Sequence, residues 1–226
     1  MPPTTPPSPP PPDLRAATDG LDGPMVDTLG DFVVALNAML AELKLPALER
    51  GFVEHTIGKG SEHLIRSTLA HLKAPASLYE AAWEGYQRHY LAINGQHAQV
   101  FPGVVEGLQR LVDRGWSLVC LTNKPTAFAM PLLQQKGLSR FFKAAFGGGA
   151  FERKKPDPLP LLKACEALDT LPARVLMIGD SSNDAQAARA AGCPVVLVTY
   201  AYNHGEPIHA VPADGYLDRL DQLLLD

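Results

Sequence analysis

The stretch VLMIGDSSNDAQAARAAG at residues 175–192 constrains the fold of this chain more than any other. Its apolar beginning is typical of a buried parallel strand, and its alanine-rich second half, which stops at Gly192, indicates a helix. Asp180 and Asp184 then lie on the loop after a strand, where open α/β sheets bind their ligands. Two carboxylates so spaced suit a hard cation such as magnesium, although aspartates at such a turn can also simply cap the helix.

The composition is that of an ordinary globular chain of 226 residues, 46% apolar and 19% charged, with a formal net charge of -4. Since no basic stripe could neutralise phosphates, we expect neither nucleic acid nor an anionic membrane surface as a partner. The three cysteines lack CxxC spacing, which favours reduced, buried thiols in a cytoplasmic protein. We find no apolar run long enough for a membrane span and no signal-peptide core.

The pattern changes twice along the chain. Residues 1–13 are rich in proline and are expected to form a disordered tail. Residues 30–100 show helical spacing and no strand pattern, so we expect an all-helical cap of four or so helices. Residues 14–29 and 101–226 are expected to form an α/β core, with the cap inserted after its first strand.

The core is predicted from its alternation of strand and helix patterns after residue 101, which implies right-handed crossovers and a doubly wound parallel sheet. After the first strand, the expected strands are WSLVCL, a short one near residues 142–146, VLMIGD and PVVLVTY. A last helix is expected near residues 217–225.

Two further loops in this core carry polar groups. Thr122 and Asn123 end the LVCL strand, where a hydroxyl and backbone N–H groups can hold a phosphate oxygen. Lys155 lies between prolines that restrict its backbone, and a fixed ammonium there could neutralise developing negative charge. Taken alone, these features also fit a Thr-Asn turn and a solvated lysine pair.

In this order, the motifs resemble those of the haloacid dehalogenase superfamily of phosphatases. The family's second motif is a Thr or Ser after an apolar strand, matched by Thr122, and its third is a Lys before proline, matched by Lys155. Its fourth, GDSxxD, is matched by Asp180 and Asp184. Within the family, the segments VDTLGDF, FPGV, LTNKP and TYAYNHGEPI look most like bacterial phosphoglycolate phosphatases.

The family's first motif, DxDGT[LM]VD[ST], is altered at residues 20–28. Its nucleophilic aspartate is replaced by Gly20 and its threonine by Pro24, whereas its second aspartate, the expected general acid/base, is Asp22. A glycine can neither attack phosphorus nor bind magnesium. Asp19 lies one residue early and could serve as a displaced nucleophile if the permissive Gly20 formed a bulge.

The resemblance implies a phosphomonoester hydrolase that converts 2-phosphoglycolate to glycolate and phosphate through an aspartyl-phosphate. It implies that Thr122, Asn123 and Lys155 bind phosphate. Magnesium is the implied cofactor, with Asp22, Asp180 and Asp184 as the residues that hold it. The expected partner is a small phosphorylated substrate, and the expected assembly is a monomer or homodimer.

Lys59 follows Gly58 in the cap and resembles a cap-loop residue that meets the substrate carboxylate, although a solvated lysine is an equal alternative. A rival to the enzyme is a non-catalytic relative that keeps the fold and acts as a binding or regulatory protein. Gly20 and Pro24 favour this rival, and the intact remaining motifs favour the hydrolase.

Overall fold

The computed structural model describes residue 14 and residues 16–58, 60–203 and 205–223, with the side chains of residues 18 and 19 excepted. The predicted disordered tail, residues 1–13, and Lys59 therefore lie outside the described residues. None of the helices in the described part combines the length and apolar character needed to cross a membrane.

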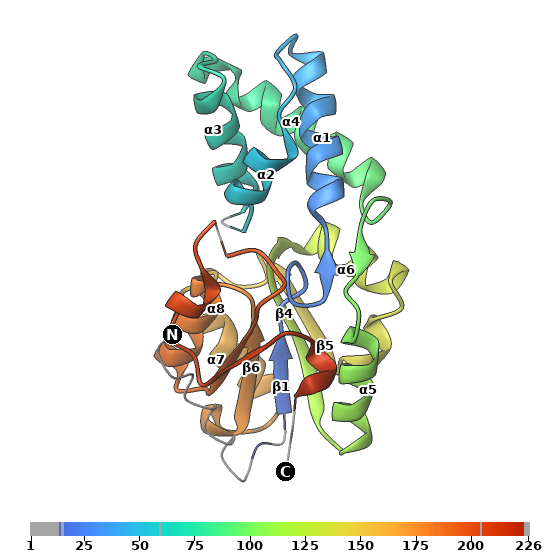
Figure 1. Cartoon of the computed structure of the whole chain (residues 1–226), viewed down its shortest axis with the longest axis vertical. Coiled ribbons are helices and arrows are strands. Elements are labelled where there is room, and N and C mark those ends of the chain that lie inside the picture. Colours follow the sequence, from blue (N-terminus) through green and yellow to red (C-terminus); the bar gives the residue numbers. More distant parts are fainter. Residues whose placement is uncertain (1–13, 15, 59, 204, 224–226) are drawn as a thin grey trace, which may run out of the picture.

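A parallel sheet forms the centre of the molecule (Figure 1). Within the described residues it has six strands in the order β5-β4-β1-β6-β7-β8. Their bounds are β1 Ala16–Asp19, β4 Ser117–Pro125, β5 Ala144–Gly148, β6 Val175–Gly179, β7 Val195–Val198 and β8 Gly215–Leu217. Although β1 contains mainly small and polar residues, it pairs with β4 on one side and β6 on the other.

Helices cover both faces of this sheet (Figure 1). They are α5 Val104–Asp113, α6 Thr126–Gln135, α7 Leu159–Ala167 and α8 Ser182–Ala191. Because side chains alternate along a strand, Leu118 and Cys120 pack toward α5 and α6, whereas Val119 and Leu121 pack toward α7 and α8. The predicted doubly wound α/β class is confirmed.

Four helices form a separate unit at the carboxyl end of β1 (Figure 1). They are α1 Leu29–Glu42, α2 Arg50–Thr56, α3 Ser61–His71 and α4 Tyr79–Ile93, and we call them the helical unit. They share a buried apolar cluster that includes Leu36, Met39, Ile65 and Tyr86. The division of the chain into domains at residues 30 and 100 stays a prediction.

Two short chain segments connect the helical unit to the sheet. They pair as an antiparallel ribbon of β2, Val26–Asp27, and β3, Gln99–Val100. The buried carboxylate of Asp31 accepts hydrogen bonds from the N–H groups of Gly95, at 2.6 Å, and His97, at 2.8 Å. Asp31 thus fastens the start of α1 to the returning chain.

The structure contradicts two predictions. The segment expected to be a final helix, near residues 217–225, instead begins with Leu217, the last residue of β8, which pairs with β7, and continues into the 3-10 turn η5, Leu220–Gln222; residues 224 and 225 lie outside the described residues. The physical reason is that β7 offers unpaired backbone groups to β8, while Leu220 packs against Gly107 of α5. Strand β3 also lies in a region where no strand was expected, because its backbone pairs with β2.

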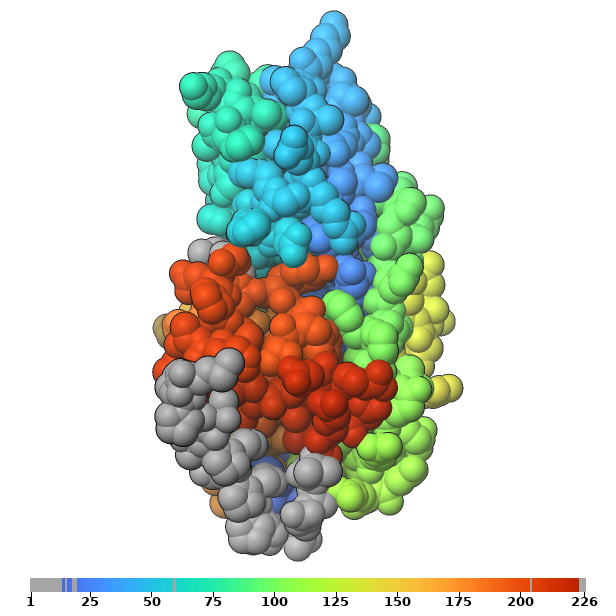
Figure 2. Space-filling model, in the orientation of Figure 1, coloured from blue at the N-terminus to red at the C-terminus, as the bar shows by residue number. Residues whose placement is uncertain are grey.

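Four more single-turn 3-10 helices complete the described elements. They are η1 Ala76–Leu78, η2 Ser139–Phe141, η3 Pro172–Arg174 and η4 Ile208–Ala210. Other boundaries differ from the predicted ones by a few residues, as is usual at fraying ends. In Figure 2, the helical unit rests on the loops that follow β7, drawn in orange.

Candidate active site

The carboxyl ends of three neighbouring strands meet beneath the helical unit. Asp19 of β1 lies in register with Cys120 of β4 and Ile178 of β6, so the loops that follow begin side by side. A pocket opens there between sheet and helices. Its lining includes Gly20, Asp22, Thr122, Asn123, Lys155, Asp180 and Asp184 from the core, and Phe32, Gly60, Ser61, Tyr86 and Tyr90 from the helical unit and its loop.

A buried ion pair joins two of the predicted loops. The Lys155 Nζ lies 2.7 Å from Oδ1 of Asp184, and both side chains are buried. The same ammonium donates to the carbonyl oxygen of Leu121 at 2.9 Å. Burial opposes ionisation of Asp184, but the adjacent Lys155 outweighs it and lowers the pKa of Asp184 below its usual value.

Asn123 holds the backbone of the lysine loop. Its side-chain nitrogen donates to the carbonyl oxygen of Lys155 at 2.8 Å, and its side-chain oxygen accepts the Lys155 N–H at 3.1 Å. Thr122 lies directly before it, and its hydroxyl oxygen accepts the N–H of Lys124 at 3.1 Å. The three residues predicted to bind phosphate, Thr122, Asn123 and Lys155, therefore lie together.

Asp180 lies against the loop that follows β1. A Cβ on Gly23 would come within 2.0 Å of Oδ2 of Asp180, and Gly23 has a φ of +101°, so this close approach requires glycine. Burial, followed by repulsion from Asp184, raises the pKa of Asp180 well above its usual value. The site therefore holds a carboxylate in surroundings that favour a nearby positive charge.

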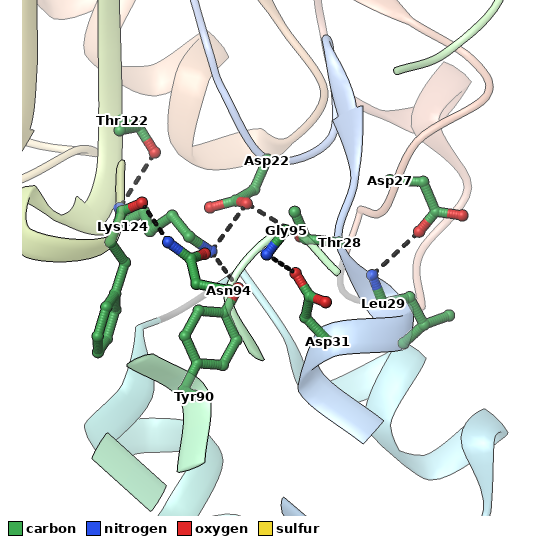
Figure 3. Close-up of polar contacts among 11 residues, drawn as sticks. Asp22, Asp27, Thr28, Leu29, Asp31, Tyr90, Asn94, Gly95, Thr122 and Lys124 are labelled. Carbon is green, nitrogen blue, oxygen red and sulfur yellow. Dashed lines mark hydrogen bonds and ion pairs between the residues drawn. The ribbon is translucent and has the colours of Figure 1, made fainter. Parts of the chain in front are cut away.

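Asp22 is at the centre of a polar network that joins the core to the helical unit (Figure 3). Its Oδ1 accepts a hydrogen bond from the Thr28 hydroxyl at 2.9 Å and lies 3.1 Å from Nζ of Lys124. Lys124 also donates to the hydroxyl of Tyr90, on α4, at 2.5 Å. Sequence reasoning missed Lys124 and Tyr90, although Lys124 follows the flagged Thr122-Asn123 pair directly.

At the position of the missing nucleophile, the backbone of β1 is regular. The described pairing runs through Asp19 without a register shift, and the N–H of Gly20 donates to the carbonyl oxygen of Ile178 at 3.2 Å. The bulge that a displaced nucleophile would need is not present in this described backbone. The side chain of Asp19 lies outside the described residues.

The donors present suit a magnesium site that the substrate completes. No three histidine, cysteine or acidic side chains in the described part of the chain form a ready metal cage. Both oxygens of Asp184 are engaged, since Oδ1 contacts Lys155 and Oδ2 accepts from the Asp180 N–H and the Ser181 hydroxyl, each at 3.0 Å. Magnesium usually takes one or two carboxylates plus phosphate oxygens and waters, an arrangement that Asp180 fits.

The fold and site together define a doubly wound α/β protein whose candidate site lies between the sheet and an inserted helical unit. The chain belongs to the haloacid dehalogenase-like hydrolase family, whose profile matches residues 20–198. A phosphoglycolate phosphatase of Thiobacillus denitrificans is 39% identical, with 94% of this chain and 95% of that protein covered. A plasmid-encoded phosphoglycolate phosphatase of Cupriavidus necator is 44% identical, with 90% of this chain and 88% of that protein covered.

Solved structures agree with this assignment. The crystal structure of a predicted phosphoglycolate phosphatase from Haemophilus somnus has a TM-score of 0.88 and 28% identity, and it covers 93% of this chain and 96% of that one. A haloacid dehalogenase-like hydrolase from Bacteroides fragilis has a TM-score of 0.82 and 25% identity, with 93% of this chain and 100% of that one covered. The resemblance inferred from the motifs is confirmed.

Proposed function

We propose that this chain has the substrate site and the acid/base group of a phosphomonoester hydrolase, with 2-phosphoglycolate as the first candidate substrate. The observation that carries the proposal is that Asp22, Thr122, Lys155 and Asp180 all line one pocket at the carboxyl edge of the sheet. The names of the relatives from Thiobacillus and Cupriavidus support the choice of substrate.

The residues divide into three roles. Thr122, Asn123 and Lys155 hold the phosphate, because a hydroxyl, an amide and a buried ammonium are natural donors to its oxygens. Asp22 gives a proton to the leaving alkoxide and later takes one from the attacking water. Asp180, oriented beside Asp184, would hold magnesium, which supplies positive charge against the phosphate oxygens when bound.

The absence of a nucleophilic carboxylate limits the rate of hydrolysis. In this family a carboxylate after the first strand attacks phosphorus and forms an aspartyl-phosphate, and Gly20 has none to offer. We therefore propose that the chain as it stands turns its substrate over slowly or not at all. This observation favours the second candidate function, a protein that binds a phosphomonoester without hydrolysing it.

The helical unit would act as a cap that closes over the ester and excludes water. A contact from Lys59 to the substrate carboxylate stays a prediction, because Lys59 lies outside the described residues. The cytoplasmic location and the monomeric or dimeric state also stay predictions.

Two measurements test the proposal. Release of inorganic phosphate from 2-phosphoglycolate, with magnesium and then with a chelator, measures turnover. Calorimetric titration with inorganic phosphate under the same conditions measures binding. Binding with magnesium-dependent turnover supports the hydrolase, binding without turnover supports the second candidate, and absence of both contradicts the proposal.

A further inference from the structure

Lys124 is a buried cation in the wall of the pocket, and no motif assigns it a role. It lies near the end of β4 and is 6% exposed. Its ammonium also lies 4.5 Å from the ring centre of Tyr90 and 4.8 Å from that of Phe32. Burying an ammonium away from water is costly, so the burial of Lys124 in the pocket wall suggests a functional role.

The ammonium of Lys124 has one N–H group that is not used in its hydrogen bonds. Of its three N–H groups, one reaches Asp22 and one reaches the hydroxyl of Tyr90. Among the described residues, nothing else accepts from it. Lys155 also has two partners for its ammonium, the Asp184 carboxylate and the Leu121 carbonyl oxygen, and its remaining N–H is the one that would meet the phosphate.

The negative charge available to Lys124 is also shared. Asp22 is the carboxylate that contacts it within the described residues, and the same oxygen, Oδ1, accepts the hydroxyl of Thr28. A buried ammonium that shares its counter-ion is suited to receive a second anion.

The position of Lys124 indicates which part of a substrate it would meet. The proposed phosphate donors Thr122 and Lys155 lie at the sheet edge, whereas Lys124 points from that edge to Tyr90 of the helical unit (Figure 3). Asp22, beside it, would contact the ester oxygen. Lys124 therefore lies next to the organic part of the ester.

We infer that Lys124 binds a carboxylate of the substrate and selects phosphomonoesters in which the carbon attached to the ester oxygen also carries a carboxylate. The inference rests on the proposed function and adds its specificity-determining residue. The aromatic rings of Phe32, Tyr90 and Phe128 line the same pocket as Lys124 and would pack against the short organic group of such an ester.

Two phosphonates that resist hydrolysis separate carboxylate recognition from phosphate recognition. 3-Phosphonopropionate replaces the ester oxygen of 2-phosphoglycolate with a methylene group, and propylphosphonate has a methyl group in place of its carboxylate. Calorimetry in magnesium buffer gives the affinity ratio for the two, in the parent chain and in Lys124→Met. Lys163→Met is the matched control, because Lys163 is an exposed lysine on α7 that pairs with Glu166.

We expect the parent and Lys163→Met to bind 3-phosphonopropionate more tightly by about tenfold or more, as a charged hydrogen bond warrants. Lys124→Met should bind both ligands about equally, because it should lose about tenfold more affinity for 3-phosphonopropionate than for propylphosphonate. If Lys124→Met does not fold, as judged by its thermal transition, Lys124→Gln takes its place with the same expectation.

Four results would overturn the inference. The parent could bind both phosphonates equally, which leaves the proposed function standing. The Lys124 variants could keep the full preference, above all if Lys59→Met loses it. They could instead lose affinity for both ligands alike, which would make Lys124 a structural residue. A parent that binds neither phosphonate contradicts the proposed function, and the inference with it.

Discussion

The ring of Pro24 lies over the Cα of Gly20, so that a Cβ added to Gly20 would lie 3.0 Å from Cγ of Pro24 and 4.0 Å from Nζ of Lys155. A side chain at this position would therefore point into the pocket, toward the proposed phosphate site. The two departures from the family's first motif are thus in contact, and each affects what the other allows.

This contact predicts that Gly20→Asp combined with Pro24→Thr raises magnesium-dependent hydrolysis of 2-phosphoglycolate by roughly a thousandfold or more, since it restores the nucleophile. Gly20→Asp alone should be less stable by about 1–3 kcal/mol, because Pro24 crowds the new side chain. Phosphate release and urea unfolding measure the two effects. Gly20→Asn with Pro24→Thr is the matched control and should stay inactive.

One result would contradict this prediction. If the parent chain hydrolyses 2-phosphoglycolate rapidly and Asp19→Asn abolishes that activity, Asp19 is the nucleophile despite the regular pairing of β1. Asp19→Asn can also be added to the variant that carries Gly20→Asp and Pro24→Thr. Activity that stays unchanged there would show that the carboxylate introduced by Gly20→Asp is the nucleophile in that variant.

Asp180→Asn is predicted to stabilise the protein in a chelator at neutral pH by about 1 kcal/mol, because it removes a buried carboxylate that Asp184 repels. The raised pKa of Asp180 determines how its contribution to stability changes with pH. Asp180 stabilises the folded chain below its unfolded pKa of about 4, and this contribution is lost as the pH rises through its folded pKa. The advantage of the variant should therefore vanish in acid.

Magnesium should stabilise the parent chain but not Asp180→Asn. We expect it to raise the melting temperature of the parent and to leave that of Asp180→Asn unchanged, as binding to the folded state requires. Scanning calorimetry at several magnesium concentrations checks this. Equal increases in both proteins would remove Asp180 from the metal site.

Asp184→Ala is predicted to lower the free energy of unfolding by about 3–5 kcal/mol, because it leaves the buried ammonium of Lys155 without its counter-ion. Glu166→Ala, which breaks the exposed pair with Lys163, should cost about 0–1 kcal/mol. Urea unfolding at neutral pH compares them. Similar losses in the two variants would mean that the buried pair does not organise the site.

Asp31→Ala is predicted to loosen the connection between the helical unit and the sheet. The N–H groups of Gly95 and His97 would lose their acceptor, at a cost of about 2 kcal/mol. Hydrogen exchange should then speed up at these two amides, and Asp113→Ala, an exposed change on α5, should not affect it. Unchanged exchange in Asp31→Ala would show that the ribbon of β2 and β3 alone holds the connection.

Local patterns were enough to predict β6 and the loops that carry Lys155 and Asp180, because an apolar run followed by polar residues reflects the burial of one strand and the exposure of its end. Thr122, which was expected on a loop, lies within β4 because the strand continues to Pro125. The same reasoning failed near the end of the chain. The leucines of residues 217–225 have helical spacing, but Leu217 ends β8, and the open edge of β7 provides its backbone partner, which no local pattern records.

The sequence by itself determined the fold class, the family and the absence of a carboxylate at Gly20, because each of these depends on residue types in a short, ordered pattern. Only the tertiary structure decided that Asp184 pairs with Lys155, that Pro24 covers Gly20 and that Lys124 links Asp22 to Tyr90. The physical reason is that these are contacts between different loops and helices. They exist only once packing has brought the segments together and removed water from between them.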